Sequence, residues 1–185
     1  MLAPNNLLKE HILMISLYDL TVVSYIRVLD ATVGVLKKSE AHFKAQDLDL
    51  NDIVSMQLAP DMFGFPFQIN SVRHHSLHAA QGILSGEFSP PEPLPELDFA
   101  GLVAVLEKTR KDLDGFSADE INARSGKPVT FKMGSMEIPF TADNFALAFS
   151  IPNLYFHAAT TYDMLRIKGA PIGKMDFMGK MPVGA

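Results

Sequence analysis

The chain has 185 residues, enough for one domain that buries a sizeable core. Its composition is 48% hydrophobic and 20% charged with a net charge of −5, which argues against the clustered basic surface of a nucleic-acid-binding protein. Cysteine is absent, which excludes disulfides, thiolate nucleophiles and sulfur-ligated metals, so any metal would need histidine or oxygen ligands.

The N-terminal segment has the features of neither a signal peptide nor a membrane span. No basic stretch precedes its apolar run, which covers only residues 12–17. We expect residues 1–16 to be an N-terminal extension, with Met14 as an alternative start of the chain. We expect a cytoplasmic protein without a membrane partner.

Two long helices are predicted in the first half of the chain. Apolar residues recur at spacings of three and four from about Thr21 to Ala45, which predicts an amphipathic helix. A breaker rich in Pro and Gly follows, and it leads into a second helix from about Phe67 to Leu84. Gly86 is expected to end that helix.

The region after Gly86 reads as a linker and then a third helix. Prolines at positions 90, 91, 93 and 95 predict a stiff, extended connection inside one domain. Asp98 is a suitable N-cap for the next helix, whose apolar face runs from Phe99 to Phe116.

A change of period predicts a β-hairpin before the last helix. Apolar residues alternate over 129–133 and again over 136–140, and Gly134 and Ser135 form the turn between them. Thr141 then caps the final long helix, which kinks or restarts at Pro152 and ends at Gly169. The tail after Ile172 is expected to be irregular.

Two of these helices carry a polar stripe through an apolar pattern. At about 100° per residue, the last helix aligns Ser150, Asn153, His157 and Thr161. The second helix aligns Gln68, Ser71, His75 and His78 in the same way. Each stripe either faces a partner that satisfies it or forms the solvent side of its helix.

If the two stripes face each other, His75, His78 and His157 present three imidazoles. Three imidazoles are a ligand set for an open Zn²⁺, Ni²⁺ or Fe²⁺ site that leaves room for water or substrate. The alternative for His74 and His78 is a place at the solvent boundary, and the alternative for His157 is a core histidine bonded to Asn153, Thr161 or a carbonyl.

Several segments resemble the domain of unknown function family 1993, which is grouped with the DinB-like metalloenzymes. They are LYDLTVVSYIRVLD, LAPDMFGFPFQI, VTFKMGSMEIPFTADNF and IPNLYFHAATTYDMLRIKGAPIGKMDFMG. The resemblance implies an all-α DinB-like four-helix bundle with a small β-hairpin inserted before the last helix. It also implies a homodimer and a metal held by one His of the second helix and a His-x-x-x-His pair of the fourth. Some DinB-like relatives are thiol-dependent transferases or isomerases.

Carrying these ligands over residue by residue leaves one of them missing. His157 matches the first His of the pair, but Thr161 occupies the second position. The ligand of the second helix corresponds to His75, with His74 and His78 as the alternative registers. A divalent metal would then need His78 as its third imidazole, and otherwise the site is altered or lost.

The sequence therefore predicts one bundle domain over 17–179, with a tail over 180–185. The expected pocket between the second and fourth helices is lined by Gln68, His75, His78, Asn153, Tyr155, His157 and Thr161. Three functions stay open: a metal-assisted enzyme for a small organic molecule, a metal-free pocket for a small apolar molecule, and a dimerising module without a ligand.

Overall fold

The computed structural model describes residues 15–183. Most of the expected N-terminal extension, and with it the alternative start at Met14, lies outside these described residues. Within them no helix combines the length and apolar character needed to cross a membrane.

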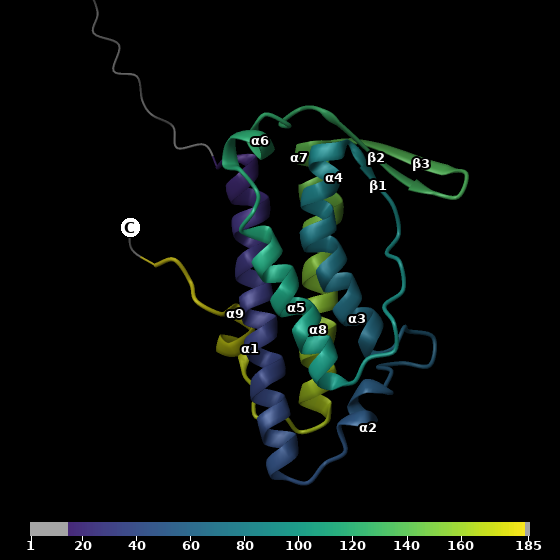
Figure 1. Ribbon diagram of the computed structural model, residues 1–185, viewed down its shortest axis with the longest axis vertical. Coiled ribbons are helices and arrows are strands. Elements are labelled where there is room, and N and C mark those ends of the chain that lie inside the picture. The colour runs from purple at the N-terminus through teal and green to yellow at the C-terminus, as the bar shows by residue number, and fades with distance from the viewer. Residues whose placement is uncertain (1–14, 184–185) are drawn as a thin grey trace, which may run out of the picture.

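The described chain is mostly helical, and its long helices lie side by side with a small sheet at one end (Figure 1). The elements in chain order are η1 (Asp19–Val23), α1 (Ser24–Ala45), α2 (Leu50–Val54), α3 (Phe65–Arg73), η2 (His74–His78), α4 (Ala79–Ser85), β1 (Glu87–Phe88), α5 (Phe99–Leu113), α6 (Ala118–Asn122), β2 (Pro128–Met133), β3 (Met136–Thr141), α7 (Ala142–Phe145), η3 (Ala146–Ser150), α8 (Ile151–Ile167) and α9 (Lys174–Met178).

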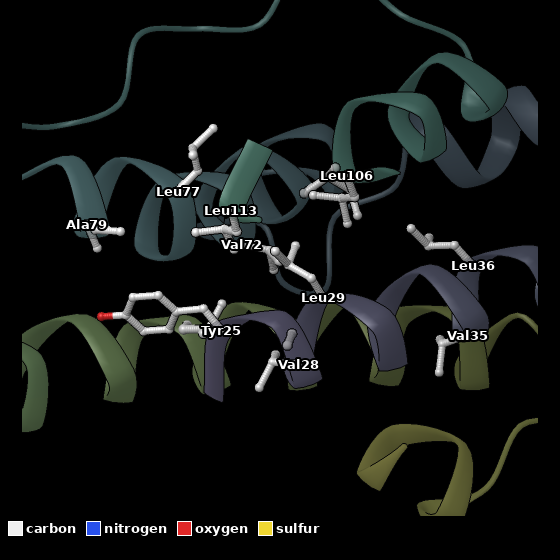
Figure 2. Close-up of a cluster of buried hydrophobic side chains, with 14 of the residues drawn as sticks. Tyr25, Val28, Leu29, Val35, Leu36, Val72, Leu77, Ala79, Leu106 and Leu113 are labelled. Carbon is white, nitrogen blue, oxygen red and sulfur yellow. The ribbon is translucent and has the colours of Figure 1, made fainter. Parts of the chain in front are cut away.

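The core forms where α1, α3, α5 and α8 pack against one another. Of the apolar stripe predicted for the first helix, Leu29 and Leu36 are fully buried in α1, and Ile26 and Val33 are partly buried against the same core. Figure 2 shows Leu29 beside Val72, and Leu36 and Leu106 belong to the same buried cluster. Burial of this continuous hydrocarbon cluster is the main force that holds the helices together.

The two predicted caps are confirmed. The Asp98 side chain accepts a hydrogen bond from the Gly101 backbone N–H at 2.7 Å, so α5 begins where the sequence indicated. Thr141 likewise accepts from the Asn144 N–H at the start of α7. Between β1 and α5 the proline-rich linker runs along the helices rather than leaving the domain (Figure 1).

The hairpin prediction is confirmed, but the sheet has a third strand. β2 and β3 pair antiparallel with Met133 opposite Met136, and Gly134 takes a positive φ of 60° in the turn between them. The two-residue strand β1 pairs in parallel with β2 through Phe88 and Phe131. A two-residue strand is too short to show an alternating pattern in the sequence. Its pairing with β2 is what makes it extended.

The tail after Ile172 is not irregular throughout, because it contains α9. The Asp176 carboxylate accepts a hydrogen bond from the Gly173 N–H at 2.7 Å, which caps the first turn. The same carboxylate pairs with Lys38 at 2.9 Å and so fixes α9 against α1. A long-range ion pair of this kind cannot be predicted from local periodicity in the sequence.

Within residues 15–183, three helical segments are π-helical, namely η1, η2 and η3. Each one continues directly into a regular α-helix, and η3 ends just before the helix turn that contains Pro152. Such wide turns are rare and occur often at functional sites. Two of them, η2 and η3, carry residues of the predicted polar stripes.

Candidate functional site

A hydrogen-bonded chain through the core joins α1, η2 and η3. The Ser150 hydroxyl donates to the His75 backbone carbonyl at 2.9 Å and also lies 2.9 Å from the Tyr25 hydroxyl. Because the serine has one hydrogen, Tyr25 must donate to Ser150. Burial raises the pKa of the Tyr25 phenol, which keeps this donor protonated. Neither Tyr25 nor this role of Ser150 was predicted from the sequence.

Gln68 fixes the orientation of the His157 ring. The Gln68 amide donates through Nε2 to the Phe63 carbonyl at 2.8 Å, which assigns Oε1 as the atom that lies 2.7 Å from His157 Nδ1. Since an amide oxygen only accepts, His157 must hold its hydrogen on Nδ1. Its Nε2 therefore presents a lone pair. Burial lowers the pKa of His157 to about 4, so the ring is neutral at pH 7.

The second imidazole of the site belongs to His75. Its ring lies 6.0 Å from the His157 ring, centroid to centroid, and the two planes differ by only 11°. His75 is 7% exposed, and its Nδ1 has no hydrogen-bond partner among the described residues. Burial lowers its pKa to about 3, so it is also neutral. An unpaired buried nitrogen is costly and marks a place where a ligand could complete the hydrogen bonding.

Aromatic rings surround both imidazoles. Phe67 meets the His157 ring edge-on at 5.9 Å, and Phe156 does so at 5.2 Å. Phe156 is 55% exposed, and Phe63, which stacks on Phe67 at 4.2 Å, is 67% exposed. Exposed aromatic rings beside a fixed hydrogen-bond acceptor form a surface on which an aromatic ligand could stack.

His78 does not join His75 and His157. Its Nδ1 lies 3.0 Å from Nδ1 of His74, whose Nε2 donates to the Ser89 carbonyl at 2.8 Å. The described part of the chain contains no group of three His, Cys, Asp or Glu side chains placed to hold a metal ion. His78 therefore does not take the place of the imidazole that is missing at Thr161.

The remaining residues of the predicted pocket use their polar groups elsewhere. Asn153 donates to the Phe149 carbonyl and Thr161 donates to the His157 carbonyl, so both are bonded to their own helix. The Tyr155 hydroxyl accepts from Arg27 of α1 at 2.6 Å. Of the seven residues of the predicted pocket, the structure brings together Gln68, His75 and His157. On the last helix, Ser150 and Thr161 are buried, so the polar stripe faces inward at these two positions.

Comparison with known proteins shows the family to which the chain belongs. A family model described as "Domain of unknown function (DUF1993)" matches residues 17–178. The crystal structure of a DinB family member protein from Shewanella denitrificans superimposes with a TM-score of 0.74 and 28% sequence identity, covering 91% of this chain and 95% of that one. No curated protein matches. The chain thus belongs to the family of the domain of unknown function DUF1993 and has a DinB-like fold.

Proposed function

We propose that the protein binds a small aromatic molecule carrying a hydroxyl or amine donor, with His157 Nε2 as the acceptor. The observation that carries this proposal is the hydrogen bond from His157 Nδ1 to Gln68, which leaves a lone pair on Nε2 of a ring that contacts the exposed Phe156 and the partly buried Phe67.

A neutral imidazole in this position supports two uses. It accepts a hydrogen bond from a bound hydroxyl, and in an enzyme it would serve as a general base. Its lowered pKa makes it a weak base at neutral pH, so binding is the use that the geometry favours. Metal-assisted chemistry and homodimer formation, both expected from the family resemblance, stay predictions.

Phenol and anisole separate hydrogen bonding from simple aromatic stacking. Phenol can donate to His157 Nε2, whereas anisole has the same ring without the donor. We expect phenol to raise the melting temperature of the wild-type protein and anisole to have little effect. The phenol effect should disappear in His157→Phe and persist in His42→Gln, a control on the distant end of α1.

The same assay tests the metal alternative on protein purified without an affinity tag. The proposal predicts that Zn²⁺, Ni²⁺ and Fe²⁺ leave the melting temperature unchanged. Stoichiometric bound metal that is lost in the His75→Ala, His157→Ala double variant would overturn it in favour of a metal centre. Equal responses to phenol and anisole would also contradict it.

A further inference from the structure

A mainly apolar cavity lies between the first helical segments, η1 and α1, and the chain that follows α9. It has a volume of about 270 Å³. Its apolar lining comes from Val23, Ile26, Met181 and Pro182, and its charged lining comes from Arg27, Asp30 and Lys180. Neither His75 nor His157 lines it, so this cavity is separate from the site proposed above.

The segment 180–182 forms one wall of this cavity because the chain passes close to α1 just before it. α9 packs against α1 (Figure 1), and Gly179 follows directly. Gly179 has a φ of 63° and a ψ of −156°, a conformation that is essentially restricted to glycine. A Cβ at this position would lie 3.0 Å from the Ala31 Cβ of α1. The wall therefore depends on the glycine at position 179.

Arg27 is held in place by a hydrogen bond to α8. Its side chain is partly buried, and its Nη2 donates to the Tyr155 hydroxyl at 2.6 Å. Within residues 15–183 this is its one side-chain hydrogen bond, and no carboxylate there forms an ion pair with it. A guanidinium is always charged and has five N–H donors. Arg27 therefore has donors left for a ligand in the cavity.

The charges around the cavity favour a negatively charged ligand. Lys180 is exposed and forms no ion pair with any other described residue. Asp30 is the one acidic side chain in the described lining, and it pairs with Arg110 at 2.9 Å rather than with Arg27. Two cations and one anion leave a net charge of +1. Arg110 also pairs with Asp114, so counting these two neighbours does not change the sum.

We infer that this cavity binds a small organic carboxylate with an apolar tail. The Arg27 guanidinium pairs with the carboxylate, whose planar geometry it matches with two parallel hydrogen bonds, and the apolar lining surrounds the tail. The volume lies just below the range of about 300–1,000 Å³ for sites of drug-sized ligands, which limits the tail to a short chain. Tyr155 is a positioning residue, because it holds Arg27 without lining the cavity itself.

Octanoate tests this inference, with acetate and 1-octanol as its controls. Acetate has the carboxylate without the tail, and 1-octanol has the tail without the charge. NMR spectra of the full chain with ¹³C-labelled Ile and Met methyl groups report on Ile26 and Met181 in the lining. We expect octanoate to shift both resonances in a saturable way. We expect 1-octanol to bind about tenfold more weakly and acetate to cause no saturable shift.

Two arginine variants isolate the role of Arg27. Arg27→Met keeps an apolar stem without the charge, so it should weaken octanoate binding about tenfold and leave 1-octanol binding unchanged. Arg73→Met is the matched control and should bind octanoate as the wild type does. Arg73 is also partly buried and without an ion pair in the described structure, but it does not line this cavity.

The positioning role of Tyr155 has a separate test. Tyr155→Phe removes the hydroxyl that holds Arg27 but leaves the cavity lining intact. It should weaken octanoate binding about threefold without changing the binding of 1-octanol. An equal loss for both ligands would assign Tyr155 a merely structural role and contradict this part of the inference.

Met181→Glu keeps the inference testable even if Arg27→Met does not fold, because Met181 is an exposed residue of the lining. It should abolish octanoate binding, since the new carboxylate repels the ligand. His157→Phe should retain octanoate binding, so failure of the first site does not affect this test. The inference is overturned if octanoate causes no saturable shift, if 1-octanol binds as tightly as octanoate, if Met181→Glu retains the wild-type affinity, or if Arg73→Met weakens binding as much as Arg27→Met.

Discussion

At the residue scale, two neighbouring histidines on one π-helical turn have opposite hydrogen-bonding states. His74 is bonded at both ring nitrogens, to His78 and to the Ser89 carbonyl. His75 has a buried Nδ1 without a partner in the described structure. The first arrangement stabilises the fold, and the second lowers stability because a buried polar atom is left unpaired.

Replacing each ring by phenylalanine tests this difference. His75→Phe removes a buried unpaired nitrogen at nearly constant volume, so we expect the free energy of unfolding at pH 7 to rise by about 1 kcal/mol. His74→Phe deletes two hydrogen bonds, so we expect a loss of about 1–2 kcal/mol. Urea denaturation measures both changes. Equal losses in the two variants would mean that His75 has a partner after all.

At the element scale, the sequence predicted what local periodicity and capping control. The α1 stripe, the hairpin and the caps at Asp98 and Thr141 follow from spacing and from single side chains. The strand β1 and the helix α9 could not be predicted, because pairing with β2 and contacts with α1 create them. The local sequence carries little sign of either contact.

The candidate site, too, was predicted only in part from the sequence. His75 and His157 were expected to meet, and they do. His78 was aligned with His75 on the assumption of a regular α-helix, but η2 is π-helical and winds more slowly. The wider turn increases the angle between His75 and His78, whereas His74 and His78, four residues apart, are neighbours in either kind of helix. The error therefore has a specific physical cause in the backbone of five residues.

Two glycine substitutions test how closely α4 packs against β1. Gly82→Ala would place a Cβ 3.1 Å from Phe88, and we expect this overpacking to cost about 1 kcal/mol net of the better helix propensity. Gly34→Ala is the matched control, because no atom lies within 4 Å of its Cβ position, and it should stabilise by about 0.5–1 kcal/mol. Thermal or urea unfolding distinguishes the two. If both substitutions stabilised the protein, β1 would have to move away from the added methyl group at little cost in free energy.

At the scale of the whole molecule, the buried histidines make stability depend on pH. The pKa values of His74, His75 and His157 in the folded protein are lowered to about 4, 3 and 4. Unfolded histidines titrate near 6.5, so between these values the unfolded chain binds more protons than the folded one. The contribution of these histidines to the free energy of unfolding is therefore fully present above about pH 6.5 and is lost as the pH falls toward 4.

We expect the free energy of unfolding to fall by about 2–4 kcal/mol between pH 7 and pH 5. The buried His74 and His75 account for most of this decrease, since His157 is more exposed to solvent. Urea unfolding at a series of pH values measures the slope, which should be shallower in His75→Phe. A stability that is constant or increases on acidification would contradict the lowered pKa values.

The most direct measurement is a long-range ¹H–¹⁵N NMR spectrum of the His157 ring at pH 7. The proposed binding site requires a neutral ring with its hydrogen on Nδ1, held by Gln68, and a bare Nε2. The spectrum should show this tautomer in the wild type and a mixture of tautomers in Gln68→Leu. A hydrogen on Nε2, or a doubly protonated ring at pH 7, would contradict the account.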